Sequence, residues 1–118
     1  MIELLPIIGS IITMLLGLMG LLSPASAAKF TSIKPDGLVG VSEIRATYGG
    51  FFLGIGGAAL FFQNHYIYLG LGIAWISAAV GRIISVIVDK SSSAKNFGGI
   101  IFEFVIGLLL ISALRTIA

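Results

Sequence analysis

The sequence contains no cysteine, a single histidine and few charged residues. The lack of cysteine excludes disulfides, thiolate metal sites and thiol nucleophiles. His65 has no second histidine or carboxylate beside it in the chain, so it lacks both a coordination set and an orienting partner. A formal net charge of +2 is too small for a nucleic-acid footprint. With no nucleotide loop, hydrolase elbow or zinc motif, we expect no enzyme activity, no metal, no cofactor and no nucleic-acid partner.

The composition is that of a membrane protein. Hydrophobic residues make up 58% of the chain and charged residues 10%, where a soluble domain has about a quarter of its residues charged. Sixteen glycines suit close packing of helices in lipid. At 118 residues the chain has room for one domain, residues 1–118.

Four apolar segments each approach the ~20 residues that a helix needs to cross a bilayer. They are residues 4–22, 41–62, 66–88 and 97–117. The polar stretch 23–40 contains Pro24 and the turn-like Pro35-Asp36-Gly37, so we expect a loop at the membrane interface. The three residues 63–65 are so few that the second and third segments must form an antiparallel hairpin. The sequence therefore predicts an all-α integral membrane bundle of four transmembrane helices.

The first segment also resembles a secretory signal peptide, since Ala25-Ser26-Ala27 before Ala28 is similar to a small-residue cleavage site. Two features argue against cleavage. The segment begins with Glu3 where a signal peptide carries lysine or arginine, and its apolar run exceeds the usual length. We therefore interpret it as a transmembrane helix.

The distribution of lysine predicts the orientation. The first and third connections share one side of the membrane and carry four lysines, whereas the opposite side carries only Arg115. The four are Lys29, Lys34, Lys90 and Lys95. By the positive-inside rule the lysine side is cytoplasmic, and both termini lie outside.

Three charged residues lie inside the apolar segments, where an unpaired charge costs several kcal/mol. Arg45 and Arg82 both stand ~25 Å from the hairpin turn by helical rise, and Glu103 lies ~9 Å into the fourth segment. We expect the three at one level near the cytoplasmic leaflet. Tyr48 follows Arg45 by three positions and so shares its helical face.

Three interpretations of this cluster remain open. The arginines would snorkel to the interface, form a structural ion network with Glu103, or bind a ligand. As a ligand site, Arg45, Tyr48, Arg82 and Glu103 would carry a net positive charge and bind a lipid or another amphiphile with an anionic head group. Tyr48 is equally well explained as an interfacial aromatic residue.

Glycines and other small residues recur at four-residue spacing in three of the segments, which predicts close helix contacts or dimerisation. The stripes are Gly9-Thr13-Gly17, Gly50-Gly54-Ala58 and Gly70-Ala74-Ala78. Gly99 and Gly107 flank Glu103 and leave space beside its carboxylate for an arginine.

Residues 43–54, Glu-Ile-Arg-Ala-Thr-Tyr-Gly-Gly-Phe-Phe-Leu-Gly, carry a family resemblance. Their core, Arg45, Tyr48, Gly49 and Gly50, with the later Arg82 and Glu103, resembles the DUF4345 family of small bacterial four-helix membrane proteins, over most of the chain. The resemblance implies a four-helix bundle in the bacterial inner membrane and no established activity. Lipid or amphiphile binding is the leading hypothesis. The alternatives are an accessory subunit of a larger membrane complex and a small-solute transporter that works as an oligomer.

Overall fold

The computed structural model describes residues 4–117, which are mostly helical and contain no strand. Four helical stretches in this part of the chain are long and apolar enough to cross a membrane. They are α1 (Leu4–Leu22), the continuous run Gly37–Phe62, α5 (His65–Val88) and α6 (Ala94–Ile111). The all-α fold class is thus confirmed, as are four helical stretches that are long and apolar enough to span a membrane.

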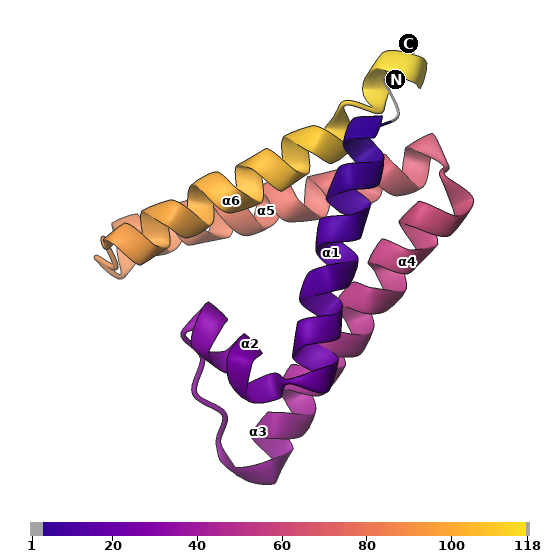
Figure 1. Cartoon of the computed structure of the whole chain (residues 1–118). Coiled ribbons are helices and arrows are strands. Elements are labelled where there is room, and N and C mark those ends of the chain that lie inside the picture. Colours follow the sequence, from indigo (N-terminus) through magenta and orange to yellow (C-terminus); the bar gives the residue numbers. More distant parts are fainter. Residues whose placement is uncertain (1–3, 118) are drawn as a thin grey trace. The chain divides into compact units, whose positions relative to one another are not determined.

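The helices group into two compact units (Figure 1). Among the described residues, one unit contains residues 4–9 and 63–117, and the other contains residues 10–62. Helix α1 contributes to both, since its first residues belong to the former and the rest to the latter. The expectation of a single domain over residues 1–118 stays a prediction.

Helices α5 and α6 form an antiparallel hairpin (Figure 1). The side chain of Asn64 caps α5 by accepting a hydrogen bond from the Tyr66 backbone N–H at 2.8 Å. The two backbones approach closely at Gly72 and Gly107, where a Cβ on Gly72 would lie 3.1 Å from the Gly107 carbonyl oxygen. The largest side chains with almost no exposure in this unit are Tyr68, Ile106 and Leu110.

Helix α1 lies along the run Gly37–Phe62 in the other unit, again through glycine. A Cβ on Gly17 would collide with the Leu53 backbone, and one on Gly20 with the Tyr48 backbone. Gly17 belongs to a predicted stripe. On the run Gly37–Phe62, however, the glycines that closely approach α1 are Gly49 and Gly56, which lie outside the predicted stripe. The predicted interface residue Gly54 has open space around it, as does Gly70 on α5.

The run Gly37–Phe62 contains a π-helix, and this explains the shifted glycine contacts. It consists of α3 (Gly37–Glu43), η1 (Ile44–Phe51) and α4 (Phe52–Phe62), of which η1 is the π-helix. A π-helix closes its hydrogen bonds one residue further along the chain than an α-helix does. Four-residue spacing through this segment therefore no longer defines a single face.

The predicted loop 23–40 contains helix where the sequence indicated turns. Residues Pro24–Thr31 form α2, with Ser23 at its N-cap position and Pro24 in the first turn, where proline loses no helical hydrogen bond. The sequence predicts that the next helix begins at residue 41, but it begins at Gly37, directly after Asp36, whose backbone is extended.

The other predicted bounds differ at helix ends. Helix α5 begins at His65, which the sequence placed in the turn. The fourth segment, expected over 97–117, begins at Ala94 because Ser93 caps it through the Asn96 backbone N–H, and it ends at Ile111. A short helix, α7 (Leu114–Ile117), follows.

Many large apolar side chains on the spanning helices are exposed, including Leu15, Phe61, Ile73, Ile101 and Leu108. In water such surfaces would be costly, whereas lipid chains match them. The exposed apolar surface therefore fits a protein whose helices face hydrocarbon.

Candidate functional site

Arg82 on α5 and Glu103 on α6 form a two-pronged ion pair. Arg82 Nε donates to Glu103 Oε1 at 3.0 Å, and Nη2 donates to Oε2 at 2.9 Å. Glu103 is 8% exposed, while the side chain of Arg82 keeps about a third of its surface exposed (35%). The fork geometry satisfies both carboxylate oxygens and cancels the two charges.

A polar chain links this pair to the connection between α5 and α6. Arg82 Nη1 donates to Asn96 Oδ1 at 3.0 Å, and Asn96 Nδ2 donates to the Ser91 carbonyl oxygen at 2.6 Å. The hydroxyls of Ser91 and Ser85 lie 3.1 Å apart, and that of Ser85 donates to Asp89. Asn96 thus connects the Arg82–Glu103 pair to the end of the hairpin, which is the geometry of a structural ion network.

Gly99 makes room for the arginine. A Cβ at this position would lie 2.8 Å from both Cζ and Nε of Arg82. The expected space beside Glu103 therefore exists on the Gly99 side. Gly107, the other flanking glycine, instead allows contact with Ile76 on α5.

Arg45 belongs to the other unit and lies in η1, with an exposed side chain. Its Nη1 donates to the carbonyl oxygen of Leu21, in the last turn of α1. A cation there satisfies one of the carbonyls that a helix end leaves without a partner and lies favourably at the negative end of the helix dipole. Within the described part of residues 10–62, no carboxylate forms an ion pair with Arg45.

Tyr48 is half-buried and packs against a small apolar cluster. The cluster consists of Ala27, Ala28 and Ile44, with Met19 beside it. The Tyr48 ring also lies 5.9 Å from that of Phe52, centroid to centroid. This packing attaches α2 to η1.

The predicted cluster of four residues is therefore distributed over both units. Arg82 and Glu103 are in contact, whereas Arg45 and Tyr48 lie in the unit formed by residues 10–62. A single site that joins all four stays a prediction. No sequence signal marks Asn96 as part of this network, because an asparagine where a loop meets a helix is typical of a cap and no spacing rule connects it to Arg82.

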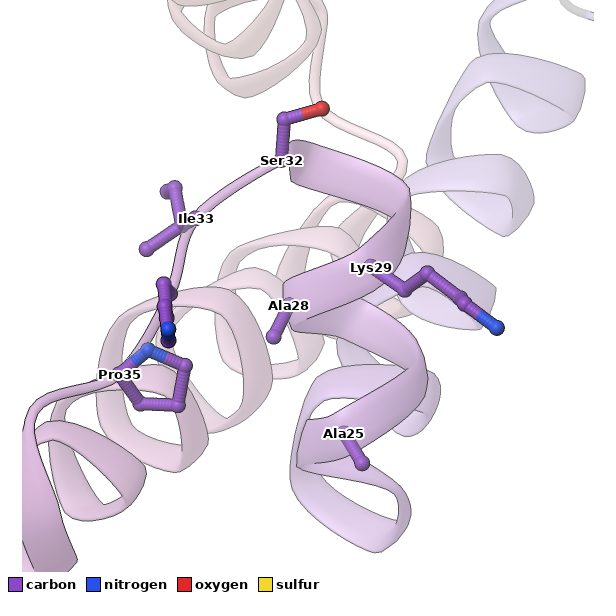
Figure 2. A pocket seen from close by; sticks show the side chains of 7 residues that line it. Ala25, Ala28, Lys29, Ser32, Ile33 and Pro35 are labelled. Carbon is purple, nitrogen blue, oxygen red and sulfur yellow. The ribbon is translucent and has the colours of Figure 1, made fainter.

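A shallow hollow lies beside α2 (Figure 2). It measures about 360 Å³ and is lined by α2 and the chain that follows it. The lining residues are Ala25, Ala28, Lys29, Ser32, Ile33, Lys34 and Pro35. In the sequence these lysines indicate only orientation, because no pattern there predicts that residues 33–35 return toward α2.

A metal centre finds no support among residues 4–117, where no group of three histidine or carboxylate side chains could hold an ion.

Comparison with known proteins gave one match. The family model described as "Domain of unknown function (DUF4345)" matches residues 2–114. No curated protein and no solved structure matches the chain.

Proposed function

Because the chain belongs to the DUF4345 family, a domain of unknown function, its role has to be argued from its own side chains, and we propose that it binds an anionic membrane lipid or amphiphile at Arg45. The observation that carries the proposal is a guanidinium in a membrane-spanning helix without a carboxylate partner in its unit. Because Arg82 and Glu103 neutralise each other, the net positive charge predicted for the cluster resides on Arg45.

The Arg82–Glu103 pair is a weaker candidate for the same role. Its charges cancel, and both oxygens of the carboxylate already accept hydrogen bonds from the arginine. A phosphate would have to displace Glu103 and leave it charged and buried, which is costly in a low-dielectric environment. The pair therefore serves the stability of the hairpin.

Arg45 has unused capacity for an anion. A guanidinium carries five N–H donors in a planar fork, and the Leu21 carbonyl takes one of them. The end of α1 places the group near a membrane surface, where lipid phosphates are available. A phosphate there would gain charge-assisted hydrogen bonds and neutralise the arginine. Tyr48, one helical turn away, would border the bound head group.

The test is to extract the protein from its own membrane in mild detergent and measure retained lipid by native mass spectrometry. We expect Arg45→Gln to reduce retention of anionic lipid about tenfold or more, since a charge-assisted hydrogen bond contributes ~1.5–3 kcal/mol. The glutamine amide can still donate to Leu21, so the end of α1 keeps a partner.

Arg115→Gln is the matched control, because it removes the same charge from an exposed residue of α7. Its lipid retention should equal that of the unmodified protein. Equal retention by Arg45→Gln would reject the proposal and leave Arg45 as a snorkelling residue that caps α1.

A second candidate function is that of an accessory subunit. It is favoured by one face of α5, where a Cβ added to Gly70 or Gly81 would meet open space and where Ala74 is exposed. Small residues of this kind let another transmembrane helix approach closely. The same mass spectrum tests it: a further polypeptide in the extracted assembly, lost on Gly81→Leu, would support the subunit role, and a free monomer would oppose it.

A further inference from the structure

Helix α2 packs back along a spanning helix and does not extend away from its end (Figure 1). The buried residues Ala27 and Ala28 of α2 pack against Ile44, the first residue of η1. The seven residues of α3 precede Ile44 in the run Gly37–Phe62, which places Ile44 ~10 Å along the run by helical rise. Helix α2 therefore lies beside the spanning run, at the level of Ile44.

The turn after α2 keeps Ile33 at this level before the chain returns to the start of α3. Ser32 adopts a left-handed conformation (φ 60°), and the Ile33 N–H donates to the Ala28 carbonyl oxygen at 3.0 Å. From Ile33 to the extended residue Asp36, which precedes α3, three positions of extended chain cover ~10 Å. This distance matches the length of α3, so Ile33 lies ~10 Å further along the run than Asp36.

The start of α3 already lies in apolar surroundings. Leu38 and Val39, in its first turn, are 85% and 75% exposed. Large apolar side chains as open as these would be costly in water, whereas lipid chains match them. Ile33 is 39% exposed and lies further along the run than both, so it faces the same hydrocarbon.

Two features set the depth of this element at the edge of the hydrocarbon. The backbone N–H groups of Ser32 and Ile33 donate to carbonyl oxygens of α2, as backbone in apolar surroundings must. In Figure 2 the Lys29 side chain runs away from Ile33 and Pro35, with its ammonium group turned outward. A lysine at the boundary of hydrocarbon and water extends its charge toward water in this way.

We propose that α2 and the turn after it form a re-entrant element that binds lipid acyl chains at the boundary between hydrocarbon and head groups, as interfacial helices do. The chains contact Ile33 and the apolar side of the hollow, to which Ala25 and Ala28 contribute (Figure 2). The occupant is hydrocarbon because this contact continues the lipid-facing surface of the spanning run, which begins at the first turn of α3. The element rests on the helices crossing a membrane and does not involve Arg45.

The test places a nitroxide on single cysteines of this cysteine-free chain and measures their depth in vesicles of phosphatidylcholine. Electron paramagnetic resonance compares collisions with oxygen, which dissolves in hydrocarbon, and with a nickel chelate, which stays in water. Leu15→Cys, at an exposed apolar position of α1, defines the hydrocarbon end of the scale. We expect the probe at Ile33→Cys to favour oxygen and to lie ~10 Å deeper than the probe at Asp36→Cys.

Asp36→Cys is the matched control, because Asp36 is exposed and its side chain does not cap α3. Equal accessibility of the two probes to the nickel chelate would overturn the proposal, since the turn would then be solvated. Protection of Ile33→Cys from both reagents would overturn it as well, because protein and not lipid would cover the turn.

A second readout tests the hollow itself. A bimane fluorophore on Ala25→Cys, at a position that lines the hollow, should be quenched by phosphatidylcholine brominated on its acyl chains. The same fluorophore on Asp36→Cys should keep most of its fluorescence in these vesicles. Retained fluorescence in both variants would refute hydrocarbon in the hollow and indicate water there.

Discussion

Glu103 depends on a single guanidinium for both of its oxygen atoms, so its substitution tests the ion pair directly. We expect Glu103→Gln to lower the free energy of unfolding by about 2 kcal/mol, because it leaves Arg82 without its counter-ion inside the hairpin. The loss is smaller than for a fully buried pair, since about a third of Arg82 is exposed (35%). Thermal unfolding in detergent measures it.

Arg82→Met/Glu103→Leu is the control for this prediction. Replacing both charges by apolar groups of similar size should restore most of the stability, because neither ion is left buried alone. An unchanged melting temperature for Glu103→Gln would contradict a stabilising role for the pair.

The sequence allowed the Arg82–Glu103 contact to be anticipated and the placement of Arg45 only in part. A short connection forces α5 and α6 into an antiparallel hairpin, so residues at equal distance from the turn come together. Arg45 lies in η1, where the depth and direction of a side chain depend on which carbonyl each N–H chooses. No spacing of apolar residues encodes that choice.

Among the helical elements, the π-helix η1 has a hydrogen-bonding pattern that a single-residue deletion should change. Deletion of Thr47, an exposed residue within it, should convert the π-helix to an α-helix and turn Ile44 away from Ala28. A cysteine replacing Ala28, 8% exposed at present, should then react faster with maleimide. Since the chain has no cysteine of its own, the labelling has no background.

Thr47→Ala is the matched control, since it keeps the number of residues in η1. It should leave the Ala28→Cys probe protected. Protection in the deletion variant as well would mean that α2 stays docked without the π-helix.

The local sequence of α2 favours both a loop and a helix. Pro24 favours a loop as a turn residue, yet proline at the start of a helix is also favourable, and the Ala-Ser-Ala-Ala sequence after it forms helix readily. What decides between them is the packing of Ala27 and Ala28 on Ile44, a contact distant in sequence.

For the whole molecule, the lysine bias predicts that both termini and the α4–α5 turn lie outside the cell membrane. Single cysteines at the exposed positions Gln63 and Ser92 probe the two sides. An impermeant maleimide added to intact cells should label Gln63→Cys and spare Ser92→Cys until the cells are opened. The reverse pattern would invert the orientation.

The ion pair of the hairpin also bears on how the chain enters a membrane. Arginine or a carboxylate at the centre of an inserting helix costs about 2.5–3.5 kcal/mol when it enters alone. Arg82 and Glu103 lie on two successive candidate spans. The free-energy cost of inserting each charge into the membrane is therefore low only when the other charge is present. The last two long helices are therefore expected to leave the translocation machinery together, α5 waiting at its lateral exit until α6 has been synthesised.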